Sequence, residues 1–313
     1  MRCLVTGGAG FIGSHLVEGL LERGHSVRVV DNFLTGKREN LARVVSKIEL
    51  VEGDIRDFSL CQKITREIDW VFHQAALPSV PRSVEDPGLS NEINVTGTLN
   101  LLIAAREAAV KKFIFASSSS VYGDDQNLPK REDILGQPLS PYAITKRVGE
   151  MYCLVFNQLY GLSTICLRYF NIFGPRQDPH SQYAAVIPNF IQRMIESRPP
   201  VIFGDGFQSR DFTYVANVVE ANIRAAEVTE VEKRIFNIAC GQRITVMELV
   251  EWINRILGKD IKPVFDPPRP GDIKHSYADI SLAQKYLDYQ PKVNFEAGLR
   301  ATIKWYQQRG VSG

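Results

Sequence analysis

Three side chains in the middle of the chain have the types and spacing needed to move a proton on and off an alcohol. Tyr142 and Lys146 are four residues apart and follow Ser140 and Pro141, which are typical of a helix start, so we expect them side by side on one helical face. An adjacent ammonium favours the phenolate and can lower the pKa of a tyrosine from about 10. Ser118 lies in a serine run that closes a predicted strand, and its hydroxyl is expected across from the phenol. The set suits oxidation of an alcohol to a ketone, although this spacing also arises by chance.

The N-terminal segment is typical of a dinucleotide-binding turn. The first 23 residues predict a strand, a glycine-rich turn at residues 7–13 and a helix that starts at Ser14. Glycines there let the backbone approach a pyrophosphate, and the helix N-terminus faces the anion. Asp31 ends a second strand about 20 residues later, where a carboxylate can bind the adenine ribose. A carboxylate would repel a ribose phosphate and so favours NAD over NADP, although the nearby cations leave this preference open, namely Lys37 and Arg38.

Strands and helices continue to alternate up to about residue 172. Further apolar strands are predicted over residues 48–52, 69–74, 112–117 and 163–169, and a long helix over residues 86–108. Nearly continuous apolar strands that alternate with helices are typical of a parallel sheet covered on both faces. We therefore expect an α/β fold with a Rossmann-like, doubly wound parallel sheet. Ligands of such sheets bind beyond the C-terminal ends of the strands, and the serine run lies at one of these ends.

Small and acidic residues follow two of these strands. Asp54 could bind the adenine of a dinucleotide or cap the next helix, and Asp57 is the better placed of the two for capping. Ala75 and Ala76 are small enough to let a cofactor lie against the end of their strand.

The alternation of strands and helices ends in the second half of the chain. Residues 174–207 are rich in loops, and the later elements are a helix near residues 187–196, a returning strand over 234–238, a proline-rich loop over 263–271 and a helical tail from 279. We expect residues 1–172, with returning segments at about 212–239, to form an NAD-binding domain. Residues 173–211 and 240–313 would then form a smaller lobe that recognises the substrate.

Composition excludes several classes of function. The 313 residues carry a net charge of +2 with acids and bases interleaved, so no nucleic-acid partner is indicated. No apolar run reaches about 18 residues and no signal-peptide pattern opens the chain, so we expect a cytoplasmic protein without a membrane segment. The five cysteines are scattered, which predicts buried thiols in a reducing compartment, and none of the spacings indicates a metal site.

Five motifs occur in order along the chain: Thr6-Gly7-Gly8-Ala9-Gly10-Phe11-Ile12-Gly13, the serine run with Val121-Tyr122-Gly123, Tyr142-x-x-x-Lys146, Leu167-Arg168-Tyr169-Phe170-Asn171 and Arg210-Asp211-Phe212. In these motifs, over essentially its whole length, the chain resembles the extended short-chain dehydrogenase/reductases. More narrowly, it resembles the 4-epimerases of UDP-glucose and UDP-N-acetylglucosamine. The resemblance implies an NAD-dependent isomerase that inverts C4 of a UDP-hexose or UDP-N-acetylhexosamine through a transient 4-keto sugar.

The resemblance also implies roles for individual residues. Ser118 and Tyr142 would flank the sugar O4, and Lys146 would hold the nicotinamide ribose. The implied cofactor contacts are Gly7, Gly10, Phe11, Ile12, Gly13, Asp31, Asn32, Gly36, Asp54, Ile55, Gln74, Ala75, Ala76, Asn94, Tyr142, Lys146 and Tyr169. The implied UDP-sugar contacts are Ser118, Ser119, Asn171, Ala185, Val186, Val201, Phe203, Arg210, Arg269, Asp272 and Ser276. Arg210 and Arg269 would bind the phosphates, because guanidinium forks bind phosphate oxygens bidentately. A homodimer through the helices near Asp86 and Tyr142 is implied as well.

The serine run argues against neighbouring activities. In this family the 4,6-dehydratases carry an Asp-Glu pair at the same strand end and the UDP-glucuronate decarboxylases a glutamate, whereas this chain has no carboxylate between Ser118 and Asp124. UDP-glucuronate 4-epimerases have a similar serine run and are the rival interpretation. A net NAD-dependent nucleotide-sugar dehydrogenase or a non-catalytic NAD sensor is less favoured, because the acid–base set is intact.

Two further positions bear on the sugar and the cofactor. In the family a tyrosine at the position of Ser276 restricts the enzyme to UDP-glucose and UDP-galactose, and a small side chain admits an N-acetyl group, so we expect N-acetylated sugars to be accepted. Several hexose epimerases have a lysine after the strand that here runs into Ala75-Ala76-Leu77-Pro78-Ser79. One charge near the cofactor is therefore missing.

Overall fold

The structure is a computed structural model that describes residues 1–179, 186–229, 231–268 and 274–310. Within these residues the chain forms a seven-stranded parallel sheet in the order β11-β6-β5-β4-β1-β2-β3. The strands are β1 (Arg2–Thr6), β2 (Ser26–Asp31), β3 (Ile48–Glu52), β4 (Trp70–His73), β5 (Lys112–Ser118), β6 (Thr164–Tyr169) and β11 (Ile235–Ile238). The order reverses between β1 and β4, as in doubly wound sheets that bind dinucleotides. The predicted fold class and strands are confirmed.

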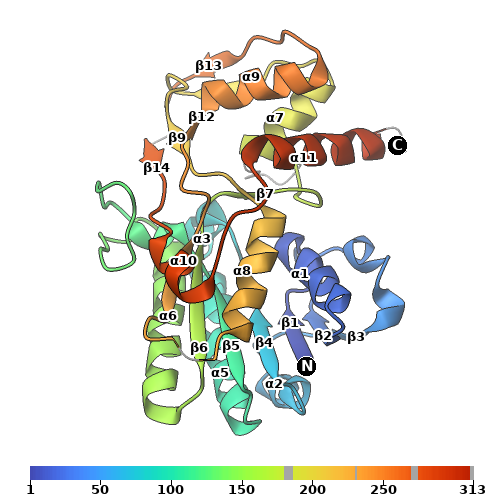
Figure 1. Ribbon diagram of the computed structural model, residues 1–313, viewed down its shortest axis with the longest axis vertical. Helices are drawn as coiled ribbons and strands as arrows, with labels where there is room; N and C mark the ends of the chain where they lie inside the picture. The colour runs from blue at the N-terminus through green and yellow to red at the C-terminus, as the bar shows by residue number, and fades with distance from the viewer. Residues whose placement is uncertain (180–185, 230, 269–273, 311–313) are drawn as a thin grey trace.

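Helices cover both faces of this sheet (Figure 1). One face carries α1 (Phe11–Glu22), α8 (Val215–Glu227) and α10 (Ser281–Leu287), and the other carries α2 (Phe58–Thr65), α5 (Gly97–Glu107) and α6 (Pro141–Tyr160). Successive side chains of a strand point to opposite faces. In β5, Ile114 and Ala116 therefore pack with the first group, and Phe113 and Phe115 with the second. This alternation explains why the strands are apolar throughout.

The long helix predicted over residues 86–108 contains a break in its hydrogen-bond pattern. It is built from α4 (Pro87–Asn91), a π turn (Glu92–Thr96) and α5, and the short helix α3 (Val80–Glu85) precedes it. Single π turns inside helices occur frequently at functional sites. Short 3₁₀ turns also occur, over Arg38–Leu41, Val45–Lys47 and Ser119–Tyr122.

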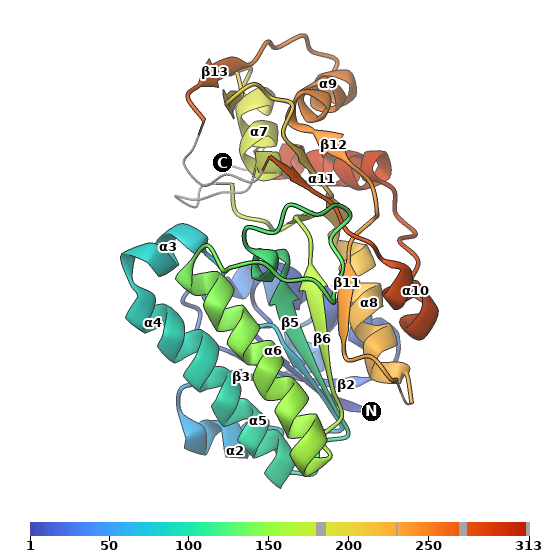
Figure 2. The same ribbon diagram turned by 90° about the vertical axis from the view of Figure 1, so that its left-hand side faces the viewer.

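A second group of helices and short strands lies beyond the C-terminal ends of the sheet strands (Figures 1 and 2). It encloses a separate apolar cluster. Its helices are α7 (Val186–Ile195), α9 (Val246–Leu257) and α11 (Phe295–Gly310). Its strands pair in small sheets: β7 (Ile172–Phe173) with β10 (Thr213–Tyr214), β8 (Val201–Phe203) with β13 (Val264–Asp266), and β9 (Ser209–Arg210) with both β12 (Ile244–Thr245) and β14 (His275–Ser276). The rings of Phe173, Phe212 and Phe295 meet at its centre, with centroids 5.7–6.4 Å apart.

Three local expectations need correction. The first helix begins at Phe11 rather than Ser14, because Gly10 is already the extended residue that precedes it. The proline-rich loop contains β13. Its residues Val264–Asp266 lie between Pro263 and Pro267 and pair with β8. The helix α10 lies in the segment assigned to the substrate lobe, yet its residues Ala283 and Leu287 pack in the core of the sheet. The domain boundaries themselves stay a prediction.

The five cysteines are free thiols. Four are buried, as expected, and Cys240 is half-buried. In the part of the chain that the structure describes, no helix combines the length and apolarity needed to cross a bilayer.

Candidate active site

Ser118, Tyr142 and Lys146 meet at the C-terminal end of β5. The hydroxyl of Ser140 accepts a hydrogen bond from the Ala143 amide at 3.1 Å and Pro141 follows it, so α6 starts where predicted. Tyr142 is hydrogen-bonded to Ser118, the last residue of β5. Lys146 lies one turn further along α6, with its Nζ 5.9 Å from the centre of the Tyr142 ring. The structure thus brings the three predicted side chains together.

The charge states of this set differ from the expectation. Burial raises the pKa of Tyr142 to about 12, and the hydrogen bond from Ser118 opposes this only in part. Burial also lowers the pKa of Lys146 to about 8. The predicted lowering of the tyrosine pKa by the lysine is therefore wrong for the protein alone. The reason is that the ammonium donates to the backbone carbonyl of Ala116 at 2.8 Å, while the phenolate would lose its hydration.

A buried ion pair adjoins these three side chains. Arg168 on β6 donates from Nε and Nη2 to the two carboxylate oxygens of Glu150, both at 2.8 Å, and Ser117 donates to the same carboxylate at 2.5 Å. Arg168 and Glu150 are only 1% and 2% exposed. Glu150 lies one helical turn after Lys146, and its negative charge partly offsets the fall in the lysine pKa. Sequence reasoning missed this pair. The spacing Lys146-x-x-x-Glu150 could have drawn attention to Glu150, but no spacing in the sequence indicates Arg168 as its partner.

The glycine turn is packed so closely that only glycine fits. Gly7 has a φ of +67°, and a Cβ on it would lie 2.8 Å from the backbone of Ala75. A Cβ on Gly13 would lie 2.2 Å from the carbonyl oxygen of Gly7. The first turn of α1, with Phe11 and Ile12, follows Gly10, which supplies no side-chain cap. The turn therefore presents backbone amides at a helix N-terminus, which suits a pyrophosphate.

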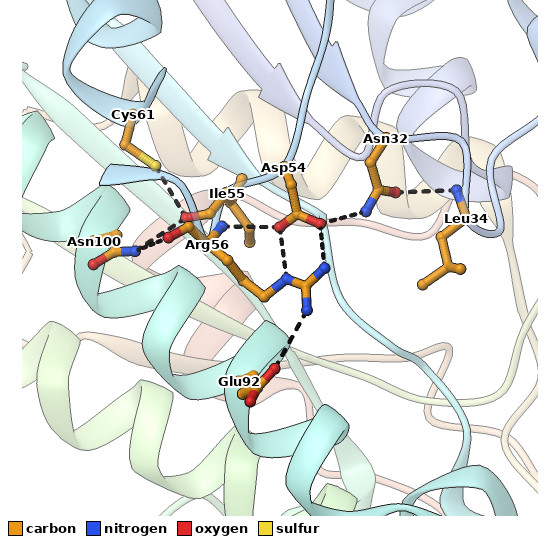
Figure 3. A network of polar contacts seen from close by, with 8 residues as sticks. All are labelled: Asn32, Leu34, Asp54, Ile55, Arg56, Cys61, Glu92 and Asn100. Carbon is orange, nitrogen blue, oxygen red and sulfur yellow. Dashed lines mark hydrogen bonds and ion pairs between the residues drawn. The ribbon is translucent and has the colours of Figure 1, made fainter. Parts of the chain in front are cut away.

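The predicted adenine end of the site is a network of polar contacts (Figure 3). Arg56 binds the carboxylate of Asp54 with two donors, at 3.0 and 2.9 Å, and Asn32 donates to it at 2.8 Å. The arginine holds the pKa of Asp54 at about 2. Arg56 also contacts Glu92 of the π turn at 3.3 Å. Asp54 thus stays ionised, with Ile55 beside it, and Asp57 caps α2 as predicted.

The second acidic residue of this region, Asp31, is buried at the end of β2. Its carboxylate accepts hydrogen bonds from the backbone amides of Ala9 and Phe33 at 2.9 and 2.8 Å. Burial raises the pKa of Asp31, and a Cβ on Gly36 would come within 2.7 Å of the carboxylate. The two cations that left the cofactor preference open are paired with carboxylates: Lys37 with Asp178 at 3.1 Å, and Arg38 with Glu52.

Other predicted cofactor residues are connected in two groups. Gln74 and Tyr169 lie together, and Asn222 of α8, which the sequence did not single out, donates to the Tyr169 hydroxyl at 2.8 Å. The side-chain amide of Asn94, in the π turn, accepts a hydrogen bond from the Leu77 backbone amide and donates one to the Thr145 hydroxyl. Ala75 and Ala76 follow β4 beside the glycine turn, as expected.

Five of the eleven predicted substrate residues line a cavity of about 280 Å³ beyond the sheet. Its walls include Asn171, Val186, Val201, Phe203 and Arg210, together with Phe190, Gln208 and Phe212, which were not predicted. Ser119 lies next to Ser118 in the 3₁₀ turn, and Ser276 of β14 pairs in register with Arg210. Ala185, Arg269 and Asp272 lie outside the described residues. Among the described residues, no three histidine, cysteine or carboxylate side chains converge to hold a metal ion.

Known proteins resemble this chain over most of its length. Residues 3–239 match the model of the NAD dependent epimerase/dehydratase family. The chain is 41% identical to a putative UDP-glucose 4-epimerase of Methanocaldococcus jannaschii, over 96% of this chain and 97% of that protein. It is 40% identical to the UDP-glucose 4-epimerase of Mycolicibacterium smegmatis, over 99% of both chains.

A solved structure is also similar over nearly the whole chain. The UDP-N-acetylglucosamine 4-epimerase of Methanobrevibacter ruminantium M1, in complex with UDP-N-acetylmuramic acid, superposes with a TM-score of 0.94 at 44% identity and 98% coverage of both chains. From its sequence motifs, its doubly wound sheet and these matches, the chain belongs to the NAD dependent epimerase/dehydratase family.

Proposed function

We propose that the protein is an NAD-dependent UDP-sugar 4-epimerase. The observation that carries this proposal is the contact between Tyr142 and Ser118 at a strand end that bears no carboxylate. Inversion at C4 needs one acid–base group at O4 and a hydride acceptor that returns the hydride to the other face. Dehydration or decarboxylation would need additional carboxylates, and Ser119 and Ser120 occupy the neighbouring positions.

The residues of the chain fit NAD. The glycine turn at Gly7, Gly10 and Gly13 would hold the pyrophosphate, and Asp31 would bind the adenine ribose. The ionised Asp54 would accept a hydrogen bond from the adenine amino group. Lys146 would hold the nicotinamide ribose. NAD, when bound, supplies hydride transfer and a positive charge that favours the phenolate of a nearby tyrosine.

In the reaction, Tyr142 removes the proton from the sugar O4, and Ser118 holds that oxygen beside the phenol. Once C4 has also lost its hydride, which NAD would accept, the sugar is a 4-ketone, and this ketone turns over while its UDP group stays bound. Tyr142 then returns the proton to O4 after C4 has been reduced from the opposite face. Lys146, held by the Ala116 carbonyl, supplies the positive charge beneath the phenol.

The cavity bounded by α7, β8 and β9 is proposed as the site of the nucleotide. Val186, Val201 and Phe203 would contact the uracil, and Asn171 and Arg210 would bind the diphosphate. The proposed division into an NAD-binding part and a substrate lobe is supported by the separate apolar cluster around this cavity. We propose the boundaries given above, except that residues 281–287 pack with the sheet.

We further propose that N-acetylated sugars are accepted. Ser276 is the neighbour of Arg210 in the small sheet, so its side chain lies close to the proposed diphosphate site. A tyrosine there would fill the space beside C2 of the sugar. Ser276→Tyr should therefore abolish turnover of UDP-N-acetylglucosamine and spare that of UDP-glucose. Equal turnover of both sugars by this variant would contradict the assignment.

The decisive experiment incubates the purified protein, without added cofactor, with UDP-N-acetylglucosamine, UDP-glucose and UDP-glucuronate separately. The C4 epimers are measured by proton NMR. Conversion of the first two is expected, whereas conversion of the glucuronate alone would favour the rival UDP-glucuronate 4-epimerase. Tyr142→Phe should lower kcat by roughly 10²–10⁴-fold, the usual contribution of a general acid–base group. Tyr160→Phe, at a half-exposed tyrosine of the same helix, serves as the control.

A homodimer is proposed from the outer face of α6. Ile144, Met151, Val155 and Leu159 are 43–65% exposed, and their spacing places them on one side of the helix. Figure 2 shows α4, α5 and α6 packed side by side on this face of the molecule. A second copy with the same face would bury the stripe in a four-helix arrangement. Light scattering should give a dimer for the wild type and a monomer for Met151→Glu/Leu159→Glu. The control is Phe207→Glu, at an exposed residue elsewhere, which should stay dimeric.

We propose a cytoplasmic location, supported by the five free thiols, since such thiols persist in reducing compartments. Cell fractionation with antibody detection tests it.

A further inference from the structure

His73 is a buried polar residue for which the reaction described above has no use. It is the last residue of β4, and only 1% of it is exposed. Its Nδ1 lies 2.8 Å from the hydroxyl of Thr6, and its Nε2 lies 2.8 Å from the hydroxyl of Thr98. The rings of Phe113 and Phe115 pack around it, with centroids 5.9 and 5.7 Å away. A neutral imidazole has one N–H, so it donates to one hydroxyl and accepts from the other.

The neighbouring contacts determine which nitrogen carries the hydrogen. Thr98 Oγ1 lies 2.6 Å from the backbone carbonyl of Asn94, and a carbonyl oxygen can only accept, so the Thr98 hydroxyl donates to it. Thr98 must then accept from Nε2 of His73. On the other side, Thr6 Oγ1 accepts from the Ala75 amide at 3.2 Å and is free to donate to Nδ1. Every donor meets an acceptor only if His73 is the Nε2–H tautomer.

This chain of hydrogen bonds joins two parts of the proposed active site. Thr6 immediately precedes the glycine turn, and Thr98 lies just after the π turn of the long helix. From that turn the side chain of Asn94 donates to the hydroxyl of Thr145 at 3.1 Å, and Thr145 donates to the backbone carbonyl of Tyr142 at 2.8 Å. His73 thus links the proposed pyrophosphate turn to the backbone of Tyr142, alongside the bonds that the Ala75 and Leu77 amides donate to Thr6 and Asn94.

We propose that His73 is a positioning residue, held as the Nε2–H tautomer, that fixes the glycine turn relative to the π turn and the catalytic helix. The proposal rests on the function proposed above, because the position of the glycine turn relative to the catalytic helix affects the reaction only if cofactor and substrate meet there. His73 is no proton carrier, because burial, and then the charge of Lys146, lower the pKa of His73 to about 3.

The tautomer is tested directly, without reference to activity. Protein with ¹⁵N-labelled histidine is examined by long-range ¹H–¹⁵N NMR between about pH 6 and about pH 9. One histidine should keep a protonated Nε2 and an unprotonated Nδ1 over this range, and it should be the signal that His73→Asn removes. A His73 signal that titrates in this range, or that shows protonated Nδ1, would overturn the proposal even if the protein proved to have another activity.

Two variants each remove one of the two side-chain hydrogen bonds of His73. His73→Asn places an amide oxygen near Nδ1, so it can still accept from Thr6 but loses Thr98. His73→Gln places an amide N–H near Nε2, so it can still donate to Thr98 but loses Thr6. We expect His73→Gln to lose bound NAD about tenfold more readily, and His73→Asn to lower kcat of the loaded enzyme about tenfold. A tenfold change corresponds to about 1.4 kcal/mol, the order of one buried hydrogen bond.

The control is Thr65→Val in α2, which removes a buried hydroxyl bonded to the Cys61 carbonyl at 2.9 Å, away from the site. It should lower the thermal unfolding temperature but leave NAD content and kcat unchanged. Should the histidine variants fail to fold, Thr98→Val replaces His73→Asn, and Thr98→Ser, which keeps the hydroxyl, should restore kcat. NAD content is measured from the nucleotide released on denaturation. Variants of His73 or Thr98 that change only the unfolding temperature, like Thr65→Val, would overturn the proposal.

Discussion

Replacing Glu150 by glutamine tests how much its buried ion pair with Arg168 contributes to the stability of the fold. The carboxylate of Glu150 accepts three hydrogen bonds, two from Arg168 and one from Ser117, and neither member of the pair is more than 2% exposed. Glutamine has a similar shape but turns one acceptor into a donor, which then faces the guanidinium. Breaking a buried ion pair on one side costs about 3–5 kcal/mol, because the remaining charge is buried without compensation.

The assay is urea unfolding followed by fluorescence. With an m value of about 3 kcal/mol/M, this loss lowers the midpoint by about 1–1.7 M. Glu296→Gln is the matched control, because Glu296 pairs with Arg300 on the exposed surface of α11 and such pairs contribute about 0–1 kcal/mol. The double variant Glu150→Gln/Arg168→Met should regain part of the loss, because it removes the unpaired charge. A midpoint for Glu150→Gln within about 0.2 M of the control would refute the reasoning.

The same substitution carries a prediction about catalysis. Glu150 is one turn from Lys146, and its charge raises the pKa of the lysine against the larger effect of burial. Without the charge of Glu150, the pKa of Lys146 should be lower than its value of about 8 in the wild type. The alkaline limb of the pH dependence of kcat should then move to lower pH in Glu150→Gln, while the limb of Glu296→Gln stays in place.

Three further predictions concern the cofactor turn, the phosphate site and acid stability. Gly13→Ala should yield protein purified without NAD, because the new Cβ would lie 2.2 Å from the Gly7 carbonyl oxygen. Gly88→Ala, whose new Cβ would make only an ordinary contact with the Asp86 carboxylate at 3.5 Å, should keep its NAD. Equal NAD contents in the two variants would contradict the proposed role of the glycine turn. Arg210→Met should raise KM for the UDP-sugar by roughly 10–100-fold with little change in kcat, as a charged hydrogen bond of about 1.5–3 kcal/mol is lost, whereas Arg300→Met should leave KM unchanged. Burial lowers the pKa of His15 from 6.5 to about 4, so on acidification the unfolded state binds the proton before the folded state does. The free energy of unfolding should therefore fall as the pH drops from 6.5 towards 4. In His15→Gln, whose amide can still donate to the Pro175 carbonyl, an acid titration of stability should show a shallower fall.

Several features of the fold and site are local in the chain, and these could be predicted. The glycine turn follows from strand, glycines and helix in succession, and the pairing of Tyr142 with Lys146 follows from the pitch of a helix opened by Ser140. The strands could be located because a sheet covered on both faces requires apolar side chains on both sides. The resemblance to a family, carried by five such local motifs, added roles for residues that no pattern distinguishes.

Other features depend on contacts between distant segments, and only the tertiary structure determined them. The cavity collects Asn171, Val186, Val201 and Arg210 from separate elements, and no period in the sequence links these positions. His73 reads as one more residue of a buried strand until Thr6 and Thr98 are seen on either side of it.

The charge states depend most on the fold. Spacing alone predicts that Lys146 lowers the pKa of Tyr142, but burial of the phenol raises it, and the ammonium is directed to the Ala116 carbonyl. Spacing determines which groups are neighbours. The free energy of each charge depends on how much water the folded chain excludes and on which partner each donor reaches, and both are properties of the packed structure.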